Sequence, residues 1–272
     1  MKKKSLFVDY KNTRIHSTDQ GKGPVVVLLH GFLENVSMWD DLAEVLSKRN
    51  RVVCIDLLGH GQSENLGYLH TMEQMSEVVA AVLKFLRVRK SIVVGHSMGG
   101  YVALAFAECF PNKVKGLCLL NSTACADSLE KQQNRDRAIS VVKKNHISFI
   151  KTAVPLLFRS KNRILFNEAI LKVKNEALKT SKQGVIAALE GMKIRQDKVA
   201  VLRSSHFKKM MILGEKDPVL NLASLLRQAE GTNTTLMQLS EGHMSLVENK
   251  EETIAAIKNF VKSCCVKVLS NK

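Results

Sequence analysis

The chain has 272 residues, of which 45% are hydrophobic and 24% charged, a composition typical of a globular protein with one substantial core and no long disordered region. No apolar stretch approaches the roughly 20 residues of a bilayer-spanning helix, and the basic start is followed by no apolar segment typical of a signal peptide. The net charge is +16, yet no basic block is interleaved with aromatic residues, so we expect no nucleic-acid partner.

The six cysteines form no C-x-x-C pair and show no regular spacing. Several stand in apolar runs, where a free thiol packs as a small hydrophobe. We therefore expect reduced thiols and a cytoplasmic protein. The adjacent Cys264 and Cys265 are expected in a frayed C-terminal tail rather than at a metal site.

The first half of the chain alternates strand-like and helix-like segments. Lys11-Asn12 separates two short mixed runs and predicts an opening hairpin. Continuous aliphatic runs, typical of strands buried on both faces, follow at 25–29, 51–56, 92–94 and 114–120. Helical patterns lie between them, the first at 38–47 with Ser37 as its expected N-cap. This alternation predicts an α/β fold whose mostly parallel sheet is covered by helices on both faces.

The pattern changes between Asp127 and about Arg195, where only helical periodicity is found. Four helices are predicted, at 129–145, 147–158, 163–179 and 182–193. An all-helical insertion is most simply a lid over the carboxyl ends of the strands, with extra packing as the alternative. Strands at 208–213 and 234–239 then complete the sheet. We therefore divide the chain into an α/β core domain, residues 1–124 and 197–272, and a helical cap, residues 125–196.

The segment Gly95-His96-Ser97-Met98-Gly99 matches the G-x-S-x-G nucleophile elbow. An apolar strand pattern precedes it and an apolar helix pattern follows, which is the context that the motif requires. A residue at the apex of such a turn has a strained backbone and an exposed side chain. Gly95 and Gly99 flank it because a Cβ there would clash where the segments approach. Ser97 is therefore the candidate nucleophile.

A serine hydroxyl needs a base to take its proton, and the base needs a carboxylate that orients it. His243 follows the last predicted strand and Asp217 the strand before it, and open α/β sheets place their sites at these strand ends. The order Ser97, Asp217, His243 is the one expected with this elbow. Two rival acids are less suited: Asp56 is expected to anchor a glycine-rich loop, and Glu241 is too close to His243 in sequence to orient its ring.

The other histidines are not expected to act as the base. His30 and His60 lie in glycine turns and are expected to brace loops through hydrogen bonds. His96 adjoins the nucleophile, so its ring must point elsewhere. The four that lack a position at a strand end are His16, His70, His146 and His206.

Together these pieces resemble the α/β-hydrolase superfamily, in its branch of small serine esterases with a helical cap. The matching motifs are His30-Gly31-Phe32, Asp56 to Ser63, Gly95 to Gly100, Gly214 to Pro218 and Gly242-His243. The resemblance implies an eight-stranded, mostly parallel sheet, a helical cap after the sixth strand and a catalytic triad of Ser97, Asp217 and His243. It also implies an oxyanion hole formed by the backbone N–H groups of Phe32 and Met98. The residues implied to support the elbow and this hole are His30, Gly31, Gly95, His96 and Gly99.

The implied reaction is hydrolysis of a carboxylic ester through an acyl-enzyme intermediate, with no metal or organic cofactor. Thioesterases, lactonases, C–C bond hydrolases, perhydrolases and the menaquinone-pathway synthase use the same triad and are alternatives, as is a non-catalytic ligand-binding protein on this fold. The expected partner is a small-molecule ester, and the basic bias of Glu130–Lys209 leaves an acidic or carrier-bound substrate open. Neither a nucleic acid nor an integral membrane segment is expected, and the chain is either a monomer or a homodimer.

Overall fold

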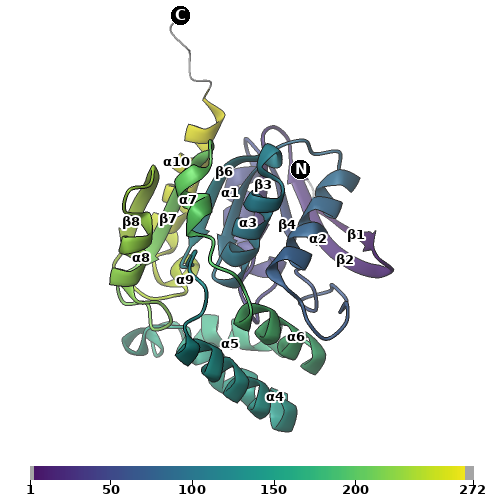
Figure 1. Ribbon diagram of the computed structural model, residues 1–272, viewed down its shortest axis with the longest axis vertical. Helices are drawn as coiled ribbons and strands as arrows, with labels where there is room; N and C mark the ends of the chain where they lie inside the picture. Colours follow the sequence, from purple (N-terminus) through teal and green to yellow (C-terminus); the bar gives the residue numbers. More distant parts are fainter. Residues whose placement is uncertain (1–2, 267–272) are drawn as a thin grey trace, which may run out of the picture.

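An eight-stranded sheet forms the centre of the molecule (Figure 1). The computed structural model describes residues 3–266, and its strands follow the order β1-β2-β4-β3-β5-β6-β7-β8. The strands are β1 Lys4–Tyr10, β2 Thr13–Gly21, β3 Val25–Leu29, β4 Arg51–Ile55, β5 Ser91–His96, β6 Val114–Leu120, β7 Lys208–Gly214 and β8 Thr234–Leu239. β2 pairs antiparallel with β1 and β4, and all other pairs are parallel. The predicted α/β fold with a mostly parallel eight-stranded sheet is confirmed.

Helices cover both faces of this sheet. The helices of the core are η1 Val36–Trp39, α1 Asp40–Ser47, α2 Met72–Phe85, α3 Met98–Cys109, η2 Pro111–Lys113, α7 Val199–Ser204, α8 Leu222–Ala229, α9 Ser245–Glu248 and α10 Lys250–Cys265. Successive residues of a strand point to opposite faces. Val27 and Leu29 of β3 accordingly pack with α2 and α3, whereas Val26 and Leu28 pack with α1 and α10. Both faces of these strands are buried, which explains why their sequences are continuously aliphatic.

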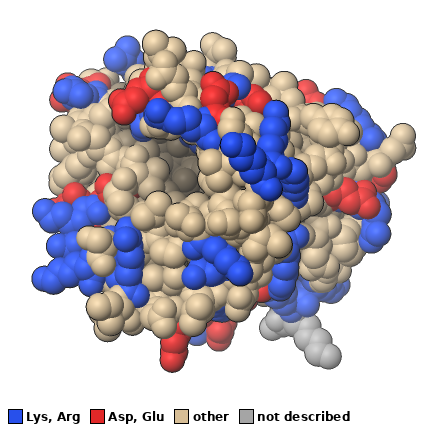
Figure 2. All heavy atoms as spheres, turned by 90° about the horizontal axis from the view of Figure 1, so that it is seen from below, with Lys and Arg blue, Asp and Glu red and all other residues tan. Residues whose placement is uncertain are grey.

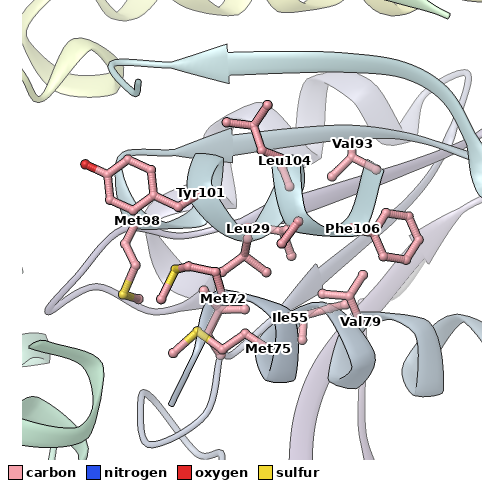
Figure 3. Close-up of a cluster of buried hydrophobic side chains, with 14 of the residues drawn as sticks. Leu29, Ile55, Met72, Met75, Val79, Val93, Met98, Tyr101, Leu104 and Phe106 are labelled. Carbon is pink, nitrogen blue, oxygen red and sulfur yellow. The ribbon is translucent and has the colours of Figure 1, made fainter. Parts of the chain in front are cut away.

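The hydrophobic cluster on the α2 and α3 side of the sheet is larger than the one on the α1 and α10 side (Figure 3). Met72, Met75 and Val79 of α2 and Leu104 and Phe106 of α3 meet there, and all five side chains are at most 1% exposed. Residues Met98–Ala107 of α3 are all buried, which explains why its sequence is apolar all round rather than amphipathic. This packing fixes the start of α3, which immediately follows Ser97.

Four further helical segments, α4 Leu129–Leu156, η3 Ser160–Asn162, α5 Asn167–Ala177 and α6 Lys182–Lys193, lie between β6 and α7. Figure 1 shows α4, α5 and α6 together below one end of the sheet. The break predicted between the first two cap helices is a kink inside α4, where Asn145 has φ −153° and ψ 91°. The Asn145 side chain accepts a hydrogen bond from the Ser148 N–H at 2.9 Å, so it caps the second half of α4.

Two expectations about local structure were wrong. The N-cap is Asn35, not Ser37: its side chain accepts the Ser37 N–H at 2.9 Å and starts the 3₁₀ turn that leads into α1. Cys264 lies within α10 rather than in a frayed tail, and its Sγ packs where Gly116 of β6 leaves room for it. Helix α7 had no counterpart among the predicted elements. Within residues 3–266, no helix is both long and apolar enough to cross a bilayer.

Candidate active site

Ser97 stands between β5 and α3 with a backbone conformation of φ 49° and ψ −116°, which is unusual for any residue other than glycine. Hydrogen bonds hold this strained turn: the Ser97 N–H donates to the Leu120 carbonyl at 3.0 Å, and the Ser122 hydroxyl donates to the Ser97 carbonyl at 2.7 Å. A Cβ on Gly95 would lie 2.2 Å from the Gly99 carbonyl oxygen. The elbow sequence therefore folds locally as its glycine spacing predicts.

His243 and Asp217 meet at the same edge of the sheet, beyond the ends of β8 and β7. His243 Nδ1 lies 2.7 Å from Asp217 Oδ2, and the two side chains are 2% and 0% exposed. Burial by itself raises the pKa of the Asp217 carboxyl. The neighbouring His243 and two backbone N–H donors, from Val219 and Leu220, outweigh burial and hold this pKa below its usual range. Asp217 is therefore a buried carboxylate that accepts a hydrogen bond from the imidazole.

His96, the residue before the serine, connects the elbow to His243. The His96 and His243 rings have centroids 5.1 Å apart, and His96 Nε2 donates to the His243 carbonyl oxygen at 3.0 Å. In the part of the chain that the structure describes, no hydrogen bond joins the Ser97 hydroxyl to the His243 ring. Such catalytic bonds are often long without a substrate and tighten when one binds.

The two backbone N–H groups implied for an oxyanion hole have no acceptor among the described residues. Neither the Phe32 nor the Met98 N–H donates a hydrogen bond within residues 3–266. Met98 is the first residue of α3, where an N–H has no acceptor inside its own helix and the helix dipole favours negative charge. Both groups can therefore donate to an oxygen that is developing negative charge.

The rival acids are engaged elsewhere. Asp56 Oδ2 lies 2.7 Å from His16 Nδ1, and the two Asp56 oxygens accept the Val36 and Gln62 N–H groups. Asp56 thus joins the glycine-rich loop to β2 and to the start of η1. Glu241 Oε2 lies 2.7 Å from a guanidinium nitrogen of Arg159, the N-cap residue of η3. Among the described residues, neither carboxylate is hydrogen-bonded to the His243 ring, whose Nδ1 faces Asp217.

The sequence of residues 24–250 matches the model of a known family, that of the alpha/beta hydrolase fold. The chain belongs to the α/β-hydrolase family. A pimeloyl-[acyl-carrier protein] methyl ester esterase from Nitrosomonas europaea is 40% identical over 111 residues, which are 41% of this chain and 42% of that protein. The chain thus spans less than half the length of this curated relative. The dihydrolipoyllysine-residue acetyltransferase component of an acetoin cleaving system from Pseudomonas putida is 29% identical over 88% of this chain and 64% of its own length.

Solved structures of other proteins share the fold of this α/β-hydrolase. A thermophilic esterase from Thermogutta terrifontis superposes with a TM-score of 0.90 and 27% identity, over 98% of this chain and 100% of the other. The enol-lactonase from Burkholderia xenovorans LB400 superposes with a TM-score of 0.88 over 94% and 100% of the two chains. Its identity is 22%, so that likeness concerns the fold alone.

The two histidines expected to brace loops, His30 and His60, both form hydrogen bonds with loop backbone. His30 Nε2 accepts the Leu57 N–H at 2.9 Å and so joins the loops after β3 and β4. His60 Nδ1 donates to the Leu58 carbonyl at 3.0 Å. Burial lowers the pKa of His30 and lowers that of His60 to about 3, so both rings are neutral supports.

Sequence reasoning missed two polar residues next to the site. Asn121 follows β6, and its Nδ2 donates at 3.2 Å to both Asp217 Oδ2 and the Gly242 carbonyl. Its position directly after a buried strand was the signal that could have found it. Glu34 is 4% exposed and lies 2.8 Å from His96 Nδ1. Its role depends on a contact across 62 residues of sequence, for which the sequence carries no local signal.

A cavity of about 350 Å³ lies between α5 and the loops after β3 and β8. Leu33 and Met244 line it, next to Phe32 and His243, although Ser97 does not. Figure 2 views the molecule from the cap side, where Lys and Arg side chains gather around a hollow. Among residues 3–266, no three His, Cys, Asp or Glu side chains are grouped as metal ligands.

Proposed function

We propose that this chain hydrolyses carboxylic esters through a triad of Ser97, His243 and Asp217. One observation carries the proposal: a serine on a strained elbow stands at the same sheet edge as a buried histidine–aspartate pair, linked to it by the His96 bond to the His243 carbonyl. Family membership and the esterases among the similar proteins support the same reaction.

In the proposed first step, Ser97 Oγ attacks the ester carbonyl carbon while His243 Nε2 accepts the hydroxyl proton. Asp217 stabilises the imidazolium that forms. The Phe32 and Met98 N–H groups donate to the oxyanion of the tetrahedral intermediate, each being worth about 3–4 kcal/mol. The intermediate collapses, the alcohol leaves with the proton from His243, and Ser97 is left acylated.

In the second step, His243 takes a proton from a water molecule, which attacks the acyl-enzyme carbonyl. The same two N–H groups hold the second oxyanion. Collapse releases the carboxylic acid, and His243 returns its proton to Ser97 Oγ. The cycle thus restores every group of the protein.

The substitution Ser97→Ala tests this mechanism. We expect kcat for p-nitrophenyl acetate to fall by several orders of magnitude, on the order of 10⁶, because the nucleophile is lost. Ser204→Ala, an exposed serine of α7, is the matched control and should keep wild-type activity. Circular dichroism checks that both variants fold. Hydrolysis by Ser97→Ala at a near wild-type rate would rule the proposal out.

Labelling separates catalysis from mere ligand binding. A fluorophosphonate should modify the wild-type protein at Ser97 and leave Ser97→Ala unlabelled. A panel of methyl and p-nitrophenyl esters, thioesters and lactones, graded by acyl length and charge, then distinguishes ester hydrolysis from the alternative reactions on the same triad. A protein that binds these compounds without turnover would be a binding protein on this fold.

The proposed substrate is an ester that carries negative charge, either free or on an acidic carrier. The cap, residues 125–196, has fifteen Lys and Arg against six Asp and Glu, so it holds +9 of the net charge of +16. A surface field of one sign attracts the opposite charge. The name of the Nitrosomonas relative, an esterase of a carrier-protein-bound ester, agrees with such a substrate.

A further inference from the structure

A buried ion pair stands beside the proposed triad without belonging to it. His96 Nδ1 lies 2.8 Å from Glu34 Oε2, and the two side chains are 2% and 3% exposed. Glutamate is almost never buried to this extent unless it is paired. Glu34 and His96 are therefore each other's partners at this buried edge of the sheet.

Both nitrogens of the His96 ring face acceptors. Nδ1 faces the Glu34 carboxylate, and Nε2 faces the His243 carbonyl oxygen at 3.0 Å. A ring that donates from both nitrogens is an imidazolium. Burial lowers the pKa of His96, but the Glu34 carboxylate outweighs burial and raises this pKa above its usual value. Burial likewise raises the pKa of Glu34, and the charge of His96 reverses this and lowers it.

The carboxylate also binds a backbone group of its own loop, the one after β3. Glu34 Oε2 also accepts the Gly31 N–H at 2.6 Å. A Cβ on Gly31 would lie 2.5 Å from Glu34 Oε2 and 2.9 Å from His96 Nδ1, so the loop after β3 packs directly onto the pair. The three hydrogen bonds thus join the loop after β3, the elbow after β5 and the loop after β8.

We infer that Glu34 and His96 are positioning residues, whose ion pair sets the distance between the oxyanion N–H of Phe32, the nucleophile Ser97 and the base His243. This inference rests on the proposed function. Each of the three loops contributes one group to the reaction, and each is bonded to the pair within one residue of that group. Reacting groups must be held closely in place, since a shift of about 1 Å can lower a rate roughly 10²-fold.

A glutamine at position 34 cannot replace the carboxylate. Its one oxygen can accept from Gly31 and from a protonated His96 Nδ1, but the His96 cation then has no counter-charge. If His96 is neutral, one bond of the cluster is lost in either tautomer. When Nδ1 donates to the glutamine oxygen, Nε2 has no proton for the His243 carbonyl; when Nδ1 instead accepts from the glutamine NH₂ group, the Gly31 N–H loses its acceptor. The variant Glu34→Gln keeps the volume of the side chain and removes the ion pair.

The experiment measures kcat and KM for p-nitrophenyl acetate, with Tm as the test of folding. We expect Glu34→Gln to lower kcat roughly tenfold, which is about the worth of one hydrogen bond to a charged group. Glu34→Ala removes all of the contacts and should lower kcat about 10²-fold. KM should stay within about twofold, because the positions matter chiefly in the transition state. Glu77→Gln, an exposed carboxylate bonded to Tyr10 and Lys11, is the matched control and should match the wild type.

A double variant tests whether the two residues act together. If Glu34 acts through His96, then Glu34→Gln combined with His96→Ala should lose no more kcat than His96→Ala alone, because residues of one unit are not additive. Wild-type kcat in Glu34→Gln, or losses that multiply in the double variant, would overturn the inference. Equal activity of the wild type and Ser97→Ala would instead overturn the proposed function, and the positioning role with it.

Discussion

At the scale of single residues, the hydrogen bonds of Asp217 decide which nitrogen of His243 carries a proton. Asp217 Oδ1 accepts the Val219 and Leu220 N–H groups at 2.7 and 3.0 Å, and Oδ2 accepts from Asn121 and His243. A carboxylate held below its usual pKa only accepts hydrogen bonds, so His243 Nδ1 must donate. The lone pair of His243 therefore stays on Nε2, the nitrogen that a base needs.

The substitution Asp217→Asn reverses this arrangement. The asparagine oxygen can still accept from Val219 and Leu220, and its NH₂ group then donates to His243 Nδ1. The proton of the neutral ring moves to Nε2, so the ring cannot accept the Ser97 proton. We expect kcat for p-nitrophenyl acetate to fall about 10⁴-fold with little change in Tm, as the wrong tautomer does in a serine protease. Asp56→Asn and Glu241→Gln should not share this loss if Asp217 is the acid, and a loss of this size in either would point to a different acid.

At the scale of elements, the cap is tied to the loop that carries His243. Asn162 Nδ2 donates to Glu248 Oε1 at 2.9 Å, and the Arg159 N–H donates to the same oxygen at 3.0 Å. Arg159 also pairs with Glu241 on the other side of His243, which lowers the pKa of that carboxyl. The turn between α4 and α5 therefore contacts a residue on each side of His243 in the sequence, Glu241 and Glu248.

The charge of the cap predicts a preference among substrates. Removing two exposed cap lysines, in Lys143→Ala/Lys144→Ala, should raise KM for an ester with a carboxylate and leave a neutral ester unchanged. Each lysine about 10 Å from the substrate carboxylate attracts it by roughly 0.4 kcal/mol in water, so the two together contribute roughly 0.8 kcal/mol. This corresponds to an increase in KM of about fourfold at low ionic strength.

Salt provides the control for this prediction. The difference between the two esters should shrink at about 1 M salt, where the Debye length is near 3 Å. The variant Lys258→Ala/Lys262→Ala loses the same charge from exposed positions on α10 and should leave both esters unaffected. An equal change in KM for both esters would contradict a charge-based preference.

At the scale of the whole molecule, buried neutral histidines make stability depend on pH. Burial lowers the pKa of His60 to about 3 and that of His70 to about 4. In the unfolded chain these rings bind protons near pH 6.5. Between those values the unfolded state binds more protons than the folded state, so the free energy of unfolding falls as the pH falls below about 6.5.

We expect His60→Gln to weaken this dependence. A glutamine can donate to the Leu58 carbonyl as His60 does, but it takes up no proton. The slope of the unfolding free energy between about pH 6 and 4.5 should therefore decrease by at most about 1.4 kcal/mol per pH unit, the value for one proton. Guanidinium chloride unfolding at several pH values measures this slope, and His206→Gln, at an exposed position, is the control. Parallel curves for His60→Gln and the wild type would show that His60 does not contribute.

Most of the fold could be predicted from patterns of residues that are close together in sequence. The aliphatic runs of β3, β4 and β6 and the break around Asn145 depend on residues close together in sequence, and the structure contains each of them. The prediction of Ser37 as the N-cap was wrong because Asn35, two residues earlier, is an equally good N-cap residue. The hydrogen bond from the Val36 N–H to Asp56 joins residues far apart in sequence, so it could not be predicted locally. Cys264 was misplaced because its burial depends on Gly116 in a distant strand.

The sequence by itself determined the elbow around Ser97, since strand propensity, two glycines and an apolar helix follow from neighbouring residues. It also determined the order in which the candidate acid and base follow the serine. Only the tertiary structure decided which acid meets His243, because Asp56, Asp217 and Glu241 differ in the partners that the order of the strands brings to them. The bond between Glu34 and His96, 62 residues apart, arises in the same way. Strand order depends on long-range packing, which local sequence patterns do not encode.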